Sequence, residues 1–265
     1  MNLNGKKIVL TGAAGGIGSE IAEQLVENGA KVALLGRDKE KLDLIAAKHG
    51  NSAMAVIVDL LDPVSRRRAL DHVVQSFGQI DVLINAAGMT SYRPFAEEDP
   101  ILLENIMKLN TIVPMMLTRA LLPDMLSRDS GKIVNIGSTF GSIAFAWFSA
   151  YSSSKFALRG LSESLRRELA GTGITVNYIA PRAVKTDLNS AAVYQMADAT
   201  GMNMDTPQWV AKKVIESIQQ DKKDVYLGFP EALFVKINAV FPRLVDLALR
   251  KQNQTMSRFA KGEQA

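Results

Sequence analysis

The chain has 265 residues, of which 47% are hydrophobic and 22% are charged. This composition supports one sizeable core and argues against a disordered or fibrous protein. Cysteine is absent, so the chain holds no disulfide and no thiolate metal site. The formal net charge of +4 comes from scattered basic residues without an aromatic-interleaved stripe, so we expect no nucleic-acid partner. The two histidines, His49 and His72, lack ligand spacing, and we expect exposed helix positions for them and no metal site.

Short apolar runs alternate with longer amphipathic segments along the chain. The runs predict strands at residues 6–10, 31–35, 53–58, 80–85, 131–136, 174–179 and 224–228. The segments between them predict helices at residues 16–28, 38–48, 62–76, 100–126, 151–170 and 207–220. Because the strands are continuous apolar runs, we expect a sheet that is covered on both faces. The pattern predicts an α/β fold with a doubly wound parallel sheet, in a single domain.

A glycine-rich turn follows the first expected strand. In "TGAAGGIGSEIAEQL", Gly12, Gly16 and Gly18 fall in the turn and at the start of the first helix. Glycine there lets the backbone approach a phosphate, and the free N–H groups of the helix N-terminus favour negative charge. The place after a strand and before a helix indicates a dinucleotide site, and a tight turn without a ligand is the alternative.

The turn and the motifs after it resemble those of the short-chain dehydrogenase/reductase family. Thr11-Gly12-x-x-x-Gly16-x-Gly18 is similar to that family's cofactor motif. Further matches follow in order: Asp59, "NAAG" at 85–88, Asn110, Ser138, Tyr151, Lys155 and "PRAVKT" at 181–186. The resemblance covers about residues 5–228 and implies a Rossmann-type fold of about seven strands with helices on both faces. It implies cofactor contacts from Gly12, Gly16, Ile17, Gly18, Arg37, Asp59, Leu60, Asn85, Ala86, Gly88, Tyr151, Lys155, Pro181, Val184 and Thr186.

Two positions depart from the family pattern. Ala86 stands where the family often has a second Asn, which is a mild change in a turn. Arg182 stands where the family usually has Gly, in a loop that borders the nicotinamide in relatives. We expect the Arg182 side chain to face solvent, and contact with an anionic substrate group is the alternative.

Tyr151 and Lys155 lie four residues apart and share one face of an expected helix. A phenol that exchanges a proton near neutrality needs its pKa lowered by roughly 3 units, which is about 4 kcal/mol. One ammonium about 4 Å away supplies roughly that much at an effective dielectric constant near 20. We therefore expect Lys155 to lower the pKa of Tyr151, which would act as general acid or base.

The resemblance also implies roles for the rest of a catalytic tetrad. Ser138 would bind the substrate oxygen, Lys155 would also bind the nicotinamide ribose, and Asn110 would hold a water that links Lys155 to solvent. Asn110 should lie at a helix distortion, because Pro114 has no N–H to donate to its carbonyl.

The end of the second strand indicates which nicotinamide cofactor binds. NAD-binding relatives generally carry an acidic residue there. In "KVALLGRDKEKL" that place is taken by Gly36, followed by Arg37, whose guanidinium can bind a 2′-phosphate in a bidentate manner. Asp38 is expected to cap the next helix. We expect NADP(H), with NAD(H) as the alternative.

The resemblance implies hydride transfer between the nicotinamide and a carbonyl or alcohol group. Phe145, Trp147 and Phe148 precede Tyr151, and the Ala- and Met-rich segment 187–206 corresponds to the family's mobile substrate loop. These features favour an apolar ketone or aldehyde as substrate, and packing in the core or a subunit contact is the alternative for the aromatic side chains. The rival functions are a nicotinamide-binding regulatory or scaffold protein, an NAD-dependent alcohol dehydrogenase, and a dehydratase or epimerase.

Residues 229–265 form an extension beyond the domain of residues 1–228. Residues 232–249 are largely apolar, and Arg250 and Lys251 follow them. We expect a lid over the substrate pocket or a subunit contact, and peripheral membrane contact through 229–250 is the alternative. The N-terminus lacks a signal-peptide apolar run and no 18-residue window is apolar and uncharged, so we expect a cytoplasmic protein. The resemblance implies a homodimer or homotetramer.

Overall fold

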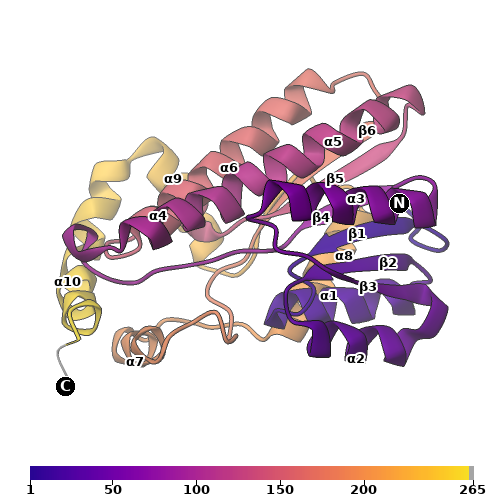
Figure 1. Cartoon of the computed structure of the whole chain (residues 1–265). Coiled ribbons are helices and arrows are strands. Elements are labelled where there is room, and N and C mark those ends of the chain that lie inside the picture. The colour runs from indigo at the N-terminus through magenta and orange to yellow at the C-terminus, as the bar shows by residue number, and fades with distance from the viewer. Residues whose placement is uncertain (263–265) are drawn as a thin grey trace.

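A parallel sheet forms the centre of the molecule. The computed structural model describes residues 1–262, and the strands found there pair in the order β3-β2-β1-β4-β5-β6-β7 (Figure 1). They are β1 (Lys7–Thr11), β2 (Lys31–Gly36), β3 (Ala53–Ile57), β4 (Val82–Asn85), β5 (Gly131–Ile136), β6 (Ile174–Ala180) and β7 (Asp224–Tyr226). Each overlaps a predicted strand, and the strand order changes direction between β1 and β4. The predicted doubly wound fold is confirmed.

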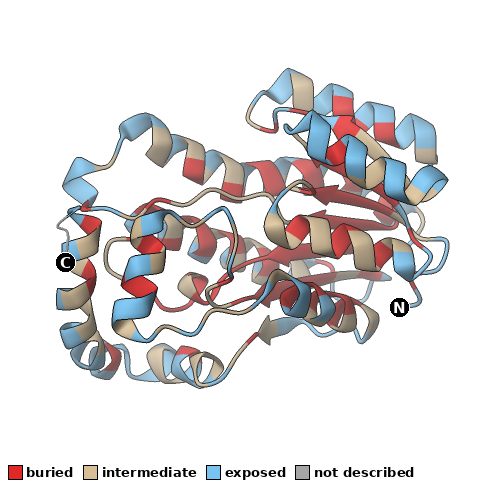
Figure 2. Cartoon of the chain, turned by 90° about the horizontal axis from the view of Figure 1, so that it is seen from below, coloured by how far each residue is buried: buried red, intermediate tan, exposed pale blue. Residues whose placement is uncertain are grey.

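Alternate residues of each strand face opposite sides of the sheet, which gives the molecule two cores. On β1, Ile8 and Leu10 pack into one core and Val9 into the other. One core is closed by α1 (Gly16–Glu27), α2 (Lys39–His49) and α8 (Pro207–Gln219). The other is closed by α3 (Pro63–Phe77), α5 (Val113–Ser127) and α6 (Ser149–Glu168). Figure 2 shows the strands buried between these two helical layers.

The predicted helix over 100–126 is interrupted where Asn110 lies. α4 (Pro100–Met107) continues into a stretch of π-helix, η3 (Lys108–Ile112), and then into α5. Pro114 has no N–H to donate to the Asn110 carbonyl, and the wider π turn accommodates that missing bond. The predicted distortion at Asn110 is confirmed. The other short helices are η1 (Gly50–Ser52), η2 (Phe95–Glu97) and η4 (Thr139–Gly141).

The segment after β6 is more regular than the sequence predicts. Within the predicted loop 187–206 lies α7 (Ala191–Thr200), whose first turn is capped by the Ser190 side chain. The extension beyond residue 228 contains α9 (Glu231–Val240) and α10 (Pro242–Ala260), and α10 packs against α7 (Figure 1). Residues 263–265 of the predicted extension lie outside the described residues.

Two aromatic side chains fix the second half of α10 to the main body. The Tyr92 hydroxyl donates to the Met256 carbonyl at 2.6 Å, and the Trp147 indole N–H donates to the Asn253 carbonyl at 3.3 Å. Across residues 1–262, no helix has the length and apolar character needed to cross a membrane. The cytoplasmic location and the membrane contact through 229–250 stay predictions.

The two histidines lie in different surroundings. His49 ends α2, and its Nε2 lies 2.8 Å from the Glu23 carboxylate on α1. Its side chain is only 10% exposed, so the prediction of an exposed position is wrong for His49, because α1 and α2 bring the pair together. His72 on α3 is exposed. In the part of the chain that the structure describes, no group of three or more potential ligand side chains could hold a metal.

Candidate active site

At Gly12 and Gly18, the glycine turn after β1 lies so close to other backbone atoms that a side chain cannot fit. Gly12 has a φ of +71°, and a Cβ there would lie 2.7 Å from the backbone of Ala87. A Cβ on Gly18 would lie 2.0 Å from the Gly12 carbonyl oxygen. Both positions therefore require glycine, and the turn exposes its backbone at the N-terminus of α1.

This turn forms the floor of a cavity of about 340 Å³, here called the glycine groove. The groove runs along the carboxyl ends of the strands, where ligands of open α/β sheets bind. It brings together ten of the residues predicted to contact a cofactor: Gly12, Gly16, Ile17, Gly18, Arg37, Asp59, Leu60, Ala86, Gly88 and Thr186.

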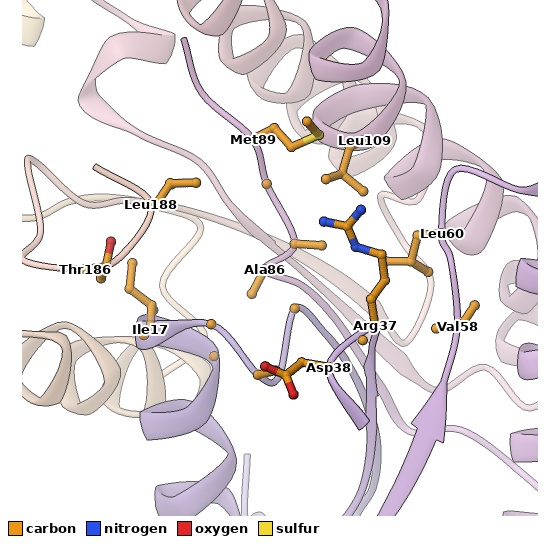
Figure 3. Close-up of a pocket in the computed structure, with 18 of the residues that line it drawn as sticks. Ile17, Arg37, Asp38, Val58, Leu60, Ala86, Met89, Leu109, Thr186 and Leu188 are labelled. Atoms are coloured by element: carbon orange, nitrogen blue, oxygen red, sulfur yellow. The ribbon is translucent and has the colours of Figure 1, made fainter. Parts of the chain in front are cut away.

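Arg37 and Asp38 take different positions at the end of β2. Arg37 extends across the groove toward Leu60 and Leu109 (Figure 3). The Asp38 carboxylate accepts a hydrogen bond of 3.1 Å from the Lys41 backbone N–H, so it caps α2 as predicted. The groove therefore presents a guanidinium beyond β2, beside a carboxylate that already has a backbone partner.

Asn85 does not line the groove, although it is predicted to contact the cofactor. Its side chain lies inside the protein, where its amide donates to the Asn135 side chain at 2.8 Å. The turn that follows it is held instead by Thr11, whose hydroxyl accepts from the Ala86 and Ala87 backbone N–H groups at 3.1 and 3.2 Å. Asn85 thus ties β4 to β5, and Thr11 positions the "NAAG" turn.

A second cavity of about 130 Å³, here called the tyrosine cavity, adjoins the groove. Ile17, Ala86, Gly88 and Thr186 line both spaces. Five other predicted residues line the tyrosine cavity: Ser138, Tyr151, Lys155, Pro181 and Val184. Residues from three separate predicted motifs therefore meet at the end of the groove.

Ser138 is held from behind by a tyrosine that the sequence reasoning missed. Ser138 precedes η4, and its side chain accepts from the Phe140 backbone N–H at 3.1 Å. The Tyr178 hydroxyl on β6 donates to the Ser138 carbonyl at 3.1 Å. A Cβ on Gly137 or Gly141 would collide with the Tyr178 side chain, so these two glycines are the sequence signal that marks a close neighbour.

The prediction that the pKa of Tyr151 is lowered is wrong for the chain by itself. Burial raises the pKa of Tyr151, and a hydrogen bond with Ser138 offsets only part of that rise. The Lys155 ammonium donates to the Ile136 carbonyl at 2.9 Å and lies 5.7 Å from the centre of the Tyr151 ring. Burial also lowers the pKa of Lys155 to about 8, because its charged form is desolvated.

Asn110 lies behind the tyrosine cavity and lines neither cavity. Its amide donates to the Met89 carbonyl at 2.8 Å and to the Ser154 hydroxyl at 2.9 Å, and its carbonyl accepts from the Met89 N–H at 2.8 Å. These bonds join η3 to the turn after β4 and to α6 at Ser154, the residue before Lys155. The water that Asn110 would hold stays a prediction.

The prediction that the Arg182 side chain faces solvent is wrong. Its guanidinium binds the Asp205 carboxylate with two hydrogen bonds of 3.0 and 2.8 Å and the Glu231 carboxylate with one of 3.0 Å. Only 17% of the side chain is exposed. These partners lie on the loop after α7 and at the start of α9, so Arg182 joins the loop after β6 to the C-terminal helices.

The three aromatic residues before Tyr151 take separate roles. Phe148 lines the tyrosine cavity and stacks on Tyr92, with ring centres 4.6 Å apart. Phe145 stacks on Phe140 at 4.5 Å, away from the tyrosine cavity. Trp147 packs toward α10 through its bond to Asn253. Of these three aromatic residues, Phe148 therefore lines the tyrosine cavity, and the apolar substrate stays a prediction.

The arrangement of glycine turn, serine, tyrosine and lysine can be compared with known proteins. A sequence model of the short chain dehydrogenases matches residues 6–197. The chain belongs to the short-chain dehydrogenase family. This short-chain dehydrogenase is 31% identical over 272 residues to the dehydrogenase/reductase SDR family member 7B of Danio rerio, a match covering 96% of this chain and 88% of the relative.

Solved structures show the same fold. A short-chain dehydrogenase from Streptomyces avermitilis matches with a TM-score of 0.81 and 31% identity, over 95% of this chain and 98% of that one. A short chain dehydrogenase/reductase from Burkholderia phymatum, solved in complex with NAD, matches with a TM-score of 0.83 and 22% identity, over 92% and 96% of the two chains. The protein is thus an oxidoreductase of the short-chain dehydrogenase family, and it shares its fold with a protein solved with NAD bound. The roles of individual site residues stay predictions.

Proposed function

We propose that this short-chain dehydrogenase is an NADP(H)-dependent oxidoreductase that reduces a hydrophobic ketone or aldehyde. Tyr151 serves as its general acid and base. The observation that supports this proposal most is the junction of the glycine groove with the tyrosine cavity, which share Ile17, Ala86 and Thr186. The groove accommodates a dinucleotide, and the cavity beside it accommodates a carbonyl group near Tyr151.

The residues of the groove fit NADP(H). No side-chain cap occupies the N-terminus of α1, so its first backbone N–H groups would meet a pyrophosphate there. At the end of β2, Gly36 supplies no carboxylate that would repel a 2′-phosphate, and Arg37 extends over the groove. A guanidinium and a phosphate form charge-assisted hydrogen bonds in a bidentate geometry.

A protonated Tyr151 suits reduction, because reduction of a carbonyl group consumes a proton. A bound NADPH would supply a hydride for the carbonyl carbon, and Tyr151 would give its phenolic proton to the carbonyl oxygen, which becomes a hydroxyl. Because burial raises the pKa of Tyr151, the phenol holds its proton at neutral pH until the oxygen develops charge. Ser138 donates a hydrogen bond to that oxygen, and the Lys155 ammonium stabilises the phenolate until it is reprotonated.

The tyrosine cavity favours an apolar substrate. Phe140, Phe148, Val193, Met196 and Met202 line it on the side away from the groove. Methionine side chains adapt their shape to a ligand, and aromatic rings supply apolar area. A compound with a polar carbonyl end and an apolar body matches this distribution.

The test measures initial rates of ketone and aldehyde reduction with NADPH and with NADH. We expect a kcat/KM for NADPH at least tenfold higher than that for NADH, since about 1.4 kcal/mol of binding to the 2′-phosphate gives that factor. Tyr151→Phe should lower kcat by about 10²- to 10⁴-fold and leave the NADPH affinity within threefold. Tyr226→Phe, which lines neither cavity, is the control.

Three outcomes would contradict the proposal. A tenfold preference for NADH would assign NAD(H), and undiminished turnover in Tyr151→Phe would place proton transfer elsewhere. A wild-type protein that binds NADPH and reduces no carbonyl compound in the panel would point to a regulatory protein on this fold.

We also propose a homodimer or homotetramer. Ile101 on α4, Met116 on α5 and Phe156 on α6 expose large apolar side chains, and α4 packs against α6 on that side of the sheet (Figure 1). Light scattering should give a multiple of the 28.8 kDa chain mass, and Ile101→Glu with Phe156→Glu should reduce it to one chain. A monomeric wild-type protein would contradict this assignment.

A further inference from the structure

A third cavity lies beneath the C-terminal helices. It measures about 490 Å³ and lies between the loop around η4, the loop after α7, and helices α9 and α10. Apolar side chains make up most of its lining, among them Ile143, Phe145, Phe234, Ile237, Val245 and Leu249. We call it the C-terminal cavity. Its volume lies in the range of small-molecule sites, roughly 300–1,000 Å³, whereas the tyrosine cavity is smaller than that range.

The C-terminal cavity adjoins the tyrosine cavity. Four residues line both spaces and form the partition between them: Phe140, Arg182, Ala183 and Met202. The Phe140 ring meets the Tyr151 ring edge-on at 6.1 Å on one side and stacks on Phe145 at 4.5 Å on the other. A ligand that reaches past Phe140 from the tyrosine cavity therefore enters the C-terminal cavity.

Met202 is the part of this partition that can move. Its backbone is held by a hydrogen bond of 2.9 Å from its N–H to the Ala197 carbonyl, whereas its side chain is only partly buried. An unbranched thioether side chain rotates about three bonds and adapts to neighbouring shapes. Rotation of the Met202 side chain would open a passage between the two cavities without moving the backbone.

The charged groups of the lining do not call for a charged ligand. Arg182 and Glu231 are the charged side chains among the lining residues, and they bind each other at 3.0 Å. The Asp205 carboxylate accepts hydrogen bonds from two further N–H groups of Arg182. A ligand portion in this cavity would meet an apolar wall and an ion pair that is already satisfied, so burial of apolar surface is what would hold it.

We infer that the C-terminal cavity binds the long apolar tail of the carbonyl substrate, while its carbonyl end lies beside Tyr151. This inference rests on the proposed function. It assigns to α9 and α10 the formation of a subsite for an aliphatic chain, in agreement with the predicted lid. Each methylene that leaves water for this cavity raises kcat/KM by about threefold to fourfold.

The experiment is a chain-length series of straight-chain aldehydes, from butanal to decanal, with NADPH. The wild-type kcat/KM should rise at least about 30-fold over the series. Val245→Phe fills the cavity from a buried position on α10 and should lower the decanal-to-butanal ratio of kcat/KM at least tenfold. Leu247→Phe adds the same ring at a position that is 65% exposed and should keep the wild-type ratio.

A second variant covers the case in which Val245→Phe fails to fold. Ala248→Phe adds bulk at a more exposed lining position on the same helix and should lower the same ratio. Calorimetric titration with 1-decanol gives a readout without turnover. The wild type and Leu247→Phe should bind 1-decanol at least tenfold more tightly than Val245→Phe or Ala248→Phe does.

The possible outcomes separate the two proposals. A flat chain-length series, or a ratio unchanged in both filled variants, overturns the tail subsite and leaves the carbonyl reductase intact. If no aldehyde is reduced but 1-decanol binding is lost on filling the cavity, the reductase proposal fails and the apolar site remains. If 1-decanol binds all variants equally, the C-terminal cavity is not its site and the inference is wrong.

Discussion

The glycine groove and the C-terminal cavity each adjoin the tyrosine cavity, but they are built in different ways. One wall of the groove is the backbone of the turn at residues 12–18, where a Cβ on Gly12 or Gly18 would meet backbone atoms. The C-terminal cavity is formed by side chains such as Ile143, Ile237 and Leu249, which come from separate segments. The groove thus depends on the absence of side chains, and the cavity depends on how helices dock. A single added methyl group should damage the first, and a single lost ion pair should loosen the second.

The largest effect is expected from a methyl group in the groove. In Gly18→Ala, the Cβ would lie 2.0 Å from the Gly12 carbonyl oxygen, so the turn has to shift. NADPH affinity should fall at least about 100-fold, because the shift removes several of the phosphate-binding N–H positions together. Fluorescence titration of NADPH measures it.

Gly160→Ala is the matched control for that substitution. A Cβ on Gly160, inside α6, would meet nothing within 4 Å. The variant should keep its NADPH affinity and gain up to about 1 kcal/mol of stability from helix propensity. If Gly18→Ala binds NADPH as well as Gly160→Ala does, the groove tolerates a side chain and the contrast between the two regions fails.

The same contrast explains what the sequence could predict. The glycine turn, the helix distortion at Asn110 and the N-cap at Asp38 are properties of residues within a few positions of each other, and all three are present. The strands of the described sheet were predictable because most of them are largely apolar runs, whereas β7 is the short Asp224–Tyr226.

Side-chain contacts over long sequence distances were not predictable. Arg182 was expected in solvent because its partners lie 23 and 49 positions further along the chain, at Asp205 and Glu231. Tyr178 supports Ser138 across 40 positions and from the neighbouring strand. The rise in the Tyr151 pKa comes from burial by segments that spacing along the chain does not reveal. The C-terminal cavity belongs to this second group.

The next largest effect concerns the cofactor phosphate. Arg37→Ala removes a guanidinium that extends over the groove, and hydrogen bonds to a charged group contribute about 1.5–3 kcal/mol. The Kd for NADPH should rise by about 30-fold, while the Kd for NADH changes less than twofold. Arg67→Ala on α3, whose guanidinium binds Asp71, removes the same charge outside the groove and should change neither Kd. Equal losses for the two cofactors would show that Arg37 does not select NADP(H).

A smaller effect on kcat/KM is expected from pH, through Lys155 in the tyrosine cavity. Burial lowers the pKa of Lys155 to about 8, so its ammonium is present below that pH and is lost above it. Since kcat/KM reports the free enzyme, the value for NADPH should fall about tenfold per pH unit above pH 8. In Lys155→Arg the side chain stays charged, and the falling limb should move to higher pH even though the remaining activity is lower. A limb that stays in place in that variant would belong to another group.

The smallest effect on NADPH binding in the groove is expected from Arg182→Ala. This variant also tests whether the groove is independent of the C-terminal cavity. The substitution leaves Asp205, whose side chain is 11% exposed, without its bidentate partner and releases Glu231 at the start of α9. Because these groups keep some contact with water, we expect a loss of about 1–2 kcal/mol, below the cost of breaking a fully buried pair. The melting temperature should drop by about 2–8 °C.

The control for Arg182→Ala is Arg243→Ala, which breaks an exposed pair with Asp246 and should leave the melting temperature unchanged. In Arg182→Ala the NADPH affinity should stay within twofold of wild type, because none of the three paired residues lines the groove. The chain-length preference should weaken, because Arg182 holds α9 over the C-terminal cavity. If NADPH affinity falls together with chain-length preference, the two regions act as one unit, and the docking of the C-terminal helices then also governs the glycine groove.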